Sequence, residues 1–82
     1  MKITYTDYAE ETLLDRKIDK KDVEDAILHP TEVIDGKKDR KIAHKLFGEK
    51  LLRVIFEIDD IKTYIVITAY FTHPARYTND EN

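Results

Sequence analysis

Three stretches in the second half of the chain alternate apolar and polar side chains, and this period of two restricts the fold more than any other feature. The stretches are RKIAHKLF (40–47), LLRVIFEI (51–58) and KTYIVITAYFT (62–72). Alternation is typical of strands that bury one face of a sheet. The short separators GEK and DD are typical of tight turns. We therefore expect a three-stranded antiparallel meander.

The last two of these strands can be aligned from their own sequences. Pairing Ile58 with Thr63 gives one almost wholly apolar face, formed by Leu52, Val54, Phe56, Ile65, Ile67 and Ala69. A slip of one residue would mix apolar and polar side chains on both faces, so this register is favoured. On the other face it places Arg53 opposite Thr68, and Leu51 opposite Tyr70.

The first half of the chain has the pattern of a short strand followed by two helices. KITYT (2–6) alternates like a strand, and Asp7 is a suitable N-cap for a helix over residues 8–17. Asp19 can cap a second helix, which Pro30 would end. Both helices are amphipathic, so we expect them to pack on the apolar face of a small twisted antiparallel sheet, in one α+β domain. The opposite face of the sheet would then be open.

The face that His44 occupies depends on the length of the turn after its strand. A two-residue turn places His44 across from Arg53 on the open face. A three-residue turn points His44 inward between Ile42 and Leu46. The sequence leaves both parities open, and a lone His between apolar neighbours is most often a structural residue.

Composition excludes several kinds of chemistry. The 82 residues include no Cys and no Ser, which excludes disulfides, thiolate nucleophiles, Cys-ligated zinc and Ser-His-Asp hydrolases. His29, His44 and His73 fall in separate elements without ligand spacing, so we expect neither a metal nor another cofactor. No apolar run is long enough to span a membrane, which favours a cytoplasmic protein. The absence of Gln and Trp, with abundant Ile, Lys and Glu, weakly indicates a thermophilic source.

Charge is segregated along the chain, although the formal net charge is only −3. Residues 37–53 carry seven Lys or Arg against two Asp or Glu, a surplus of five, whereas residues 1–36 and 54–82 are acidic. A basic run of this kind marks either a solvated pair of strands or a surface that binds an anion. It overlaps a set of cationic and proton-transferring side chains: Arg40, Lys41, Lys45, Arg53, Tyr70, His73, Arg76 and Tyr77.

This set suits the cleavage of RNA without a metal. That reaction needs a base for the 2′-hydroxyl, a cation for the charge that builds on phosphorus, and an acid for the leaving 5′-oxygen. Arg suits the second role because its planar guanidinium stays charged and binds two phosphate oxygens. Tyr and His suit proton transfer, and Tyr can stack on an unpaired base. The alternative is a solvated sheet face whose Tyr and Thr reflect strand propensity, and composition and spacing alone slightly favour it.

The order of several short motifs resembles a small family catalogued as a domain of unknown function, number 4258. The motifs are VITAY followed by Thr72 and ARY, LLRVIFE before them, and DRKIDKKDVEDAILHP further upstream, and the match covers residues 3–77. We group this family with the RelE, ParE and BrnT toxins of prokaryotic toxin–antitoxin pairs. The resemblance implies a RelE-like domain over residues 1–77, cleavage of mRNA, and an antitoxin that covers the active face. The polar residues 78–82 are typical of a disordered tail.

Carried over by position, the residues that match the family are Ala9, Arg16, Arg53, Thr68, Tyr70, Thr72, Arg76 and Tyr77. Members commonly open the first helix with a His-Ala pair and have an Arg one turn later, where this chain has Tyr8 and Thr12. If that His is the general base, this chain lacks it, and a Tyr is a poor base at neutral pH. His44 or His73 would then have to take its place.

We therefore expect the toxin of a type II toxin–antitoxin pair, a metal-independent endoribonuclease that acts on free or ribosome-bound mRNA. The expected catalytic residues are Arg53, Tyr70, His73 and His44, with Arg53 holding the scissile phosphate. The expected RNA-binding residues are Arg40, Lys41, Lys45, Thr68, Arg76 and Tyr77. The alternative is a non-catalytic module of the same fold, which binds a protein partner or forms a homodimer through its open sheet face.

Overall fold

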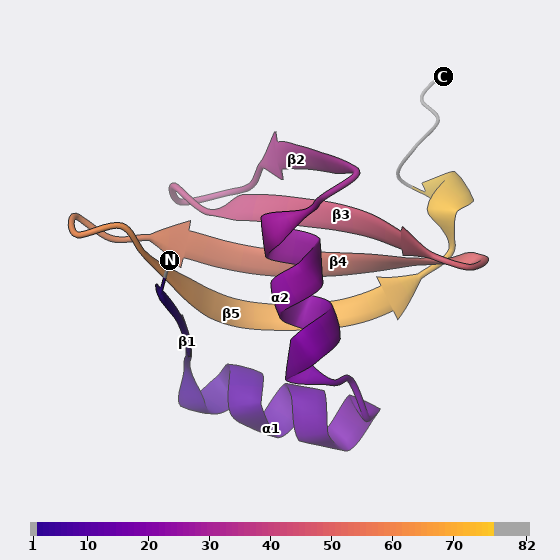
Figure 1. The fold of residues 1–82 in the computed structure, drawn as a ribbon, viewed down its shortest axis with the longest axis horizontal. Coiled ribbons are helices and arrows are strands. Elements are labelled where there is room, and N and C mark those ends of the chain that lie inside the picture. The colour runs from indigo at the N-terminus through magenta and orange to yellow at the C-terminus, as the bar shows by residue number, and fades with distance from the viewer. Residues whose placement is uncertain (1, 77–82) are drawn as a thin grey trace.

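The computed structural model describes residues 2–76, and these residues have the α+β composition that the sequence predicts. They form two α-helices and a five-stranded sheet of order β1-β5-β4-β3-β2 (Figure 1). The elements are β1 (Lys2–Tyr5), α1 (Asp7–Arg16), α2 (Lys20–Leu28), β2 (Glu32–Asp35), β3 (Lys41–Phe47), β4 (Lys50–Ile58), β5 (Thr63–Thr72) and the 3₁₀ helix η1 (Pro74–Arg76). The expected antiparallel meander is confirmed as β3, β4 and β5. The sheet is mixed rather than antiparallel, because β1 runs parallel to β5.

A capping hydrogen bond explains where α1 begins. The hydroxyl oxygen of Thr6 accepts a hydrogen bond from the backbone N–H of Ala9 at 3.0 Å, so Thr6 is the N-cap of α1. The helix therefore starts at Asp7, one residue earlier than expected, and Asp7 complements the helix dipole from the first turn. The second helix starts directly after Asp19, as expected, although the Asp19 side chain makes no capping hydrogen bond, and it ends at Leu28, before Pro30.

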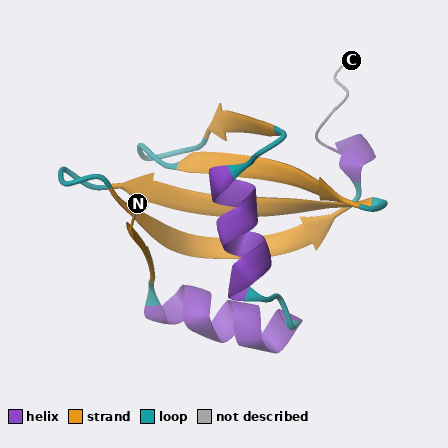
Figure 2. Ribbon diagram, viewed as in Figure 1, coloured by secondary structure: helices purple, strands orange, loops and turns teal. Residues whose placement is uncertain are grey.

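The core brings together apolar side chains of both helices and of the sheet. Figure 1 and Figure 2 show α2 crossing the central strands, whereas α1 lies along the side of the sheet next to β5. The helices contribute Ala9, Leu13, Val23, Ala26 and Ile27, and the strands contribute Ala43, Leu52, Val54, Phe56, Val66 and Ala69. None of these side chains is more than 7% exposed. Both helices therefore bury their apolar sides in one core.

The expected register of the last hairpin is wrong by one residue at the turn, where Ile58 pairs with Tyr64 rather than Thr63, and by a second residue beyond a bulge in β5. Ile67 is the extra residue between two neighbouring pairs of the β4–β5 ladder. The offset at the turn places Val66 opposite Phe56, and beyond the bulge Ala69 lies opposite Val54. Val66 and Ala69 are fully buried, whereas Ile65 and Ile67, which were expected there beside Ala69, are half-buried.

Turn length and bulge together arrange the outer face, which we define as the sheet face away from the core. The turn between β3 and β4 has two residues, and Gly48 adopts a left-handed conformation there with a φ of 63°. This is the alternative that places His44 opposite Arg53 on the outer face. The offset at the turn and the bulge together bring Tyr70 opposite Arg53, so the expected pairings of Arg53 with Thr68 and of Leu51 with Tyr70 are both wrong.

The outer face also differs from the expectation in its edge and in its burial. The segment Glu32–Asp35, which alternation did not identify, forms the edge strand β2 beside β3. The centre of the face is not open to solvent, because His44 and Leu51 have no exposed surface and Arg53 is only 9% exposed. Polar groups at the centre of this face therefore need hydrogen-bond partners within the protein.

Candidate functional site

One residue from each of four neighbouring strands forms a row across the outer face. Glu32 of β2 is paired with His44 of β3. His44 lies opposite Arg53 of β4, and Arg53 lies opposite Tyr70 of β5. Directly opposed residues of antiparallel strands project from the same face, so the register alone brings these side chains together. We call these four residues the cross-strand row.

Hydrogen bonds connect the side chains along the whole row. Nδ1 of His44 lies 2.8 Å from Oε2 of Glu32. On the other side of the imidazole, Nη1 of Arg53 lies 2.9 Å from Nε2 of His44. Nε of Arg53 donates to the hydroxyl oxygen of Tyr70 at 2.9 Å. A carboxylate on the edge strand is thus linked to a phenol on β5.

The donors in the row determine the tautomer of His44. A guanidinium can only donate hydrogen bonds, so Nε2 of His44 accepts from Arg53 and carries no proton. Nδ1 then carries the ring proton and donates it to the carboxylate of Glu32. The imidazole is therefore a neutral bridge whose orientation is set from both sides.

Burial makes this arrangement rigid. Leaving a buried polar group without its hydrogen-bond partner costs about 1–3 kcal/mol, and more for a charged group. Rotation of Arg53 away from the row would break its bonds to His44 and Tyr70 together. The guanidinium is therefore held against the Tyr70 oxygen. Because this oxygen accepts from Arg53, the hydroxyl hydrogen of Tyr70 points away from the guanidinium.

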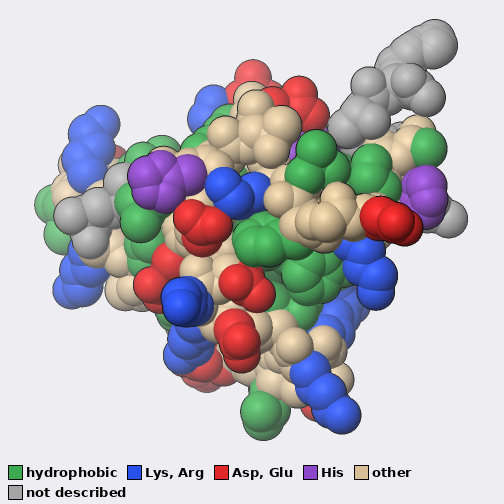
Figure 3. Space-filling model, turned by 45° about the vertical axis from the view of Figure 1, so that its right-hand side comes forward, with side chains coloured by type: hydrophobic (Ala, Val, Ile, Leu, Met, Phe, Trp, Pro, Cys, Tyr) green, Lys and Arg blue, Asp and Glu red, His purple; other side chains and the backbone are tan. Residues whose placement is uncertain are grey.

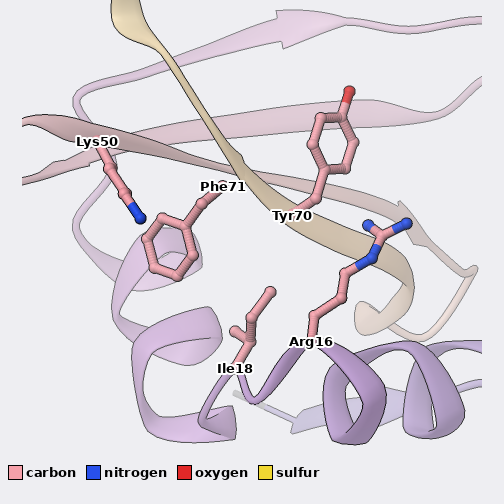
Figure 4. A pocket seen from close by; sticks show the side chains of 5 residues that line it. All are labelled: Arg16, Ile18, Lys50, Tyr70 and Phe71. Atoms are coloured by element: carbon pink, nitrogen blue, oxygen red, sulfur yellow. The ribbon is translucent and has the colours of Figure 1, made fainter.

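A second arginine approaches Tyr70 from the end of α1. Cζ of Arg16 lies 5.6 Å from the centroid of the Tyr70 ring, and Cζ of Arg53 lies 5.7 Å from it. Nη1 of Arg16 also donates to the backbone carbonyl of Ala69 at 3.2 Å. Figure 4 shows the Arg16 guanidinium beside the ring, while the hydroxyl of Tyr70 points away from the hollow. Tyr70 is thus within cation–π distance of two guanidinium groups.

The cations of the basic stretch that were expected to bind RNA make their ion pairs outside the cross-strand row. Lys45 projects towards α2, where its Nζ atom is 3.7 Å from Oδ2 of Asp25. Arg40 forms an ion pair of 3.0 Å with Glu57. Acidic and basic side chains are mixed on the surface in Figure 3, so the segregation of charge along the sequence does not produce a face of one sign in that view.

Lys41, the third cation expected in this stretch, is also paired. Its Nζ atom donates to Oδ1 of Asp35 at 2.6 Å. The hydrogen bond and the charge of Lys41 lower the pKa of the Asp35 carboxyl below its ordinary value. Both side chains are exposed, so this is a surface ion pair of the kind that contributes little to stability.

The remaining expected site residues lie near the end of β5. Thr68 precedes Tyr70 by two residues in β5 and lies opposite Ile55 of β4. His73 is exposed just beyond β5, where its Nδ1 accepts a long hydrogen bond of 3.4 Å from the backbone N–H of Ala75, and it takes no part in the row. The backbone of Arg76 belongs to η1. Tyr77 and the expected tail at 78–82 lie outside the described residues.

Sequence reasoning missed one member of the row and left another neighbour of Tyr70 unassigned. Glu32 was not considered because the strand that carries it was not recognised. The signal that could have revealed Glu32 is its spacing from His44 in the sequence, because a hairpin at the DGKKD loop pairs the two residues. Arg16 was identified as a family match, but nothing in its spacing indicates that it reaches Tyr70.

Within residues 2–76, no group of three or more His, Asp or Glu side chains is placed to hold a metal ion. No helix in the same range has the length and apolar character needed to cross a bilayer.

Comparison with known proteins identifies the family. The model of a family described as a domain of unknown function, DUF4258, matches residues 5–71. The chain belongs to the DUF4258 family. This confirms the family that the order of motifs predicts. No curated protein and no solved structure matches the chain. The DUF4258 match begins at the last residue of β1 and ends within β5, so it includes all four residues of the cross-strand row.

Proposed function

We propose that this DUF4258 protein is a toxin-type, RelE-like endoribonuclease that cleaves mRNA without a metal ion. The observation that carries the proposal is the cross-strand row, which brings Arg53, Tyr70 and His44 into hydrogen-bond contact from three strands. These are three of the four residues expected to be catalytic. Buried polar groups of this kind are often less stabilising than apolar side chains of similar volume, so a purely structural row has little advantage in so small a domain.

The reaction that suits this site is a transesterification within the RNA strand. The 2′-oxygen attacks the neighbouring phosphorus, the bond from 2′-oxygen to phosphorus forms, and the bond from phosphorus to the 5′-oxygen breaks. The proton of the 2′-hydroxyl passes to solvent, and the leaving 5′-oxygen takes a proton from an acid of the protein. The products are a 2′,3′-cyclic phosphate and a 5′-hydroxyl.

Tyr70 is the proposed acid. Its oxygen accepts from Arg53, so its own hydrogen is directed to a different acceptor, which in the complex would be the leaving 5′-oxygen. Arg53 contacts the same phenol oxygen, so its positive charge lies one side chain away from the reacting phosphate. A fixed charge of this kind stabilises the charge that builds on phosphorus, and removing such a group typically costs about 10²–10³-fold in rate.

His44 and Glu32 are positioning residues in this proposal. His44 accepts from Arg53 through Nε2, so that nitrogen is occupied and is not a proton donor to substrate. Glu32 fixes the imidazole from the edge strand. Together they hold the guanidinium in the orientation that contacts Tyr70.

The test is cleavage of a labelled single-stranded RNA by purified protein in excess EDTA. Wild type should yield the cyclic phosphate, whereas Tyr70→Phe should lose about 10²–10⁴-fold in rate, the range that general acid catalysis supplies. Lys21→Ala, an exposed substitution on α2, is the matched control and should cleave like wild type. Absence of cleavage by wild type, or an equal rate for Tyr70→Phe, would reject the proposal.

Expression in cells tests the toxin part of the proposal. Wild type should slow growth and shorten mRNA, and Arg53→Ala should do neither. Co-expression of the cognate antitoxin, the proposed protein partner, should restore growth. Normal growth and intact message with soluble wild type would contradict the assignment as a toxin.

Apolar residues on the outer face favour a second function, which is non-catalytic binding of a protein partner or of a second copy of the chain. Ile34 of β2 is 38% exposed and Leu46 of β3 is 47% exposed, which suits contact with a protein partner or a second copy of the chain. The salt dependence of binding distinguishes the two functions. Binding of single-stranded RNA should weaken with a log–log slope of about 0.7 per phosphate contacted, whereas an apolar protein contact should change little.

A further inference from the structure

A hollow lies beside Tyr70 that the reaction described above does not use. Its volume is about 610 Å³, and it is lined by Arg16, Ile18, Lys50, Tyr70 and Phe71. Figure 4 shows Phe71 and Lys50 on one side of the hollow, Arg16 and Tyr70 on the other, and Ile18 between them. The volume is in the range of pockets that hold small ligands, which is about 300–1,000 Å³.

The side chains of the hollow have two kinds of chemistry. Tyr70 and Phe71 present aromatic rings, and Ile18 is a buried apolar side chain. Arg16 and Lys50 are exposed cations, and among residues 2–76 neither of them forms an ion pair with a carboxylate. Flat apolar surfaces next to uncompensated positive charge suit a ligand that combines an aromatic ring with an anion.

The backbone of β5 adds hydrogen-bonding groups on the same side. β1 pairs with β5 only as far as Val66. Beyond that point no strand among residues 2–76 pairs with this edge of β5, and the carbonyl of Ala69 accepts there from Arg16 of α1. Because backbone groups of alternate residues in a strand point the same way, the N–H and C=O of Phe71 face this edge too. A planar ligand in the hollow therefore meets one donor and one acceptor in addition to the rings.

A second, smaller hollow continues the first. Its volume is about 240 Å³, and Lys50, Phe71, Thr72 and His73 line it. The two hollows share Lys50 and Phe71. Together the two hollows extend from Arg16 to His73 along the end of β5, and both basic and aromatic side chains line them.

We propose that the larger hollow binds a nucleotide of single-stranded RNA adjacent to the scissile phosphate, with its base against Tyr70 and Phe71 and its phosphate held by Arg16 and Lys50. This inference rests on the proposed function, because Tyr70 forms both a wall of the hollow and the acid of the reaction. The chemical class of the ligand is set by the two cations and the two rings. An acidic protein segment shares the anionic charge but offers no stacking base.

The experiment measures binding rather than cleavage. A 2′-O-methyl RNA trinucleotide has no 2′-hydroxyl, so it cannot be cut by the proposed reaction. Its dissociation constant and its salt dependence are measured by NMR titration for wild type, Lys50→Gln, Arg16→Gln and the control Lys21→Ala. Lys50 is exposed, so we expect its substitution to leave the fold intact, and this variant remains informative if loss of the Arg16–Ala69 contact unfolds the chain.

We expect amide shifts at residues 70–72 on titration. Lys50→Gln and Arg16→Gln should each weaken binding about fivefold and reduce the salt slope by about 0.7, the value for one phosphate contact on a single strand. Unchanged affinity and slope in both variants, or shifts confined to other residues, would overturn the inference. Displacement of the trinucleotide by equimolar hexaglutamate would overturn it in favour of an acidic protein segment.

These outcomes separate the inference from the proposed function. If wild type binds the trinucleotide in the hollow but cuts no RNA, the nuclease proposal fails and the nucleotide site stands. If wild type cuts RNA while both variants bind and cut normally, the nuclease proposal stands and the nucleotide site fails.

Discussion

Substitution of His44 tests whether the cross-strand row is a connected unit. The side chain of His44 is 1% exposed and bridges Arg53 and Glu32. Loss of a hydrogen bond to a buried charged group such as Arg53 costs about 1.5–3 kcal/mol. The bond to Glu32 is worth less, about 0.5–1 kcal/mol, because that carboxylate is 43% exposed and screened by solvent.

His44→Ala also leaves a cavity where the imidazole was, so we expect it to lower the free energy of unfolding by about 3–5 kcal/mol in total. This is a large part of the total stability of an 82-residue domain, which is about 4–12 kcal/mol. His44→Gln keeps an amide that can accept from Arg53, so it should lose about half as much.

Urea denaturation of wild type, His44→Ala and His44→Gln measures these differences. His44→Gln should also retain more RNA cleavage than His44→Ala, because His44 acts through the orientation of Arg53. A loss below about 1 kcal/mol for His44→Ala, or no advantage of Gln over Ala, would show that the row does not hold the guanidinium.

Three further predictions concern single residues. Burial and a 2.7 Å hydrogen bond to Glu24 raise the pKa of Tyr5 above its usual value of about 10. Tyr5 therefore stabilises the fold below that pH, and this contribution is lost as the pH rises further. Tyr5→Phe should remove this part of the alkaline dependence of stability in denaturation curves. Gly48→Ala should lower the free energy of unfolding by about 1–2 kcal/mol, because Gly48 has a φ of 63°, while Gly48→Asn should lower it less. Thr6→Ala should cost about 0.5–2 kcal/mol by removing the cap of α1, and Thr6→Ser should restore most of it, as thermal unfolding would show.

The sequence predicted the elements whose pattern is local. The alternation over the last three strands, the breaks at Asp19 and Pro30, and the family all follow from residues close together in the chain. Residues 32–35 did not stand out because a four-residue edge strand with every side chain exposed has no buried face to reveal it.

The register of the last hairpin failed for a different physical reason. The turn shifts the pairing by one residue and the bulge by another, and the run from Ile65 to Ala69 offers several apolar residues that can occupy the core. Packing against the helices selects Val66 and Ala69, and this selection moves Tyr70 opposite Arg53. The central contact of the site was therefore not visible from alternation alone.

The candidate site was predicted in its chemistry but not in its connections. Arg53, Tyr70 and His44 were selected as residue types that suit proton transfer and phosphate binding. Their hydrogen-bond order depends on the two-residue turn and on the bulge. Arg16 joins them through the position of α1 beside β5, a tertiary arrangement that no local pattern encodes.

The most direct test of the account compares two RNA substrates in which the leaving atom differs. A substrate with sulfur in place of the bridging 5′-oxygen has a leaving group that needs no proton. If Tyr70 is the acid, Tyr70→Phe should slow cleavage of the natural substrate by about 10²–10⁴-fold and that of the sulfur substrate by less than about tenfold. Equal slowing of both substrates, or no cleavage of either by wild type, would contradict the assignment of Tyr70 and with it the nuclease site.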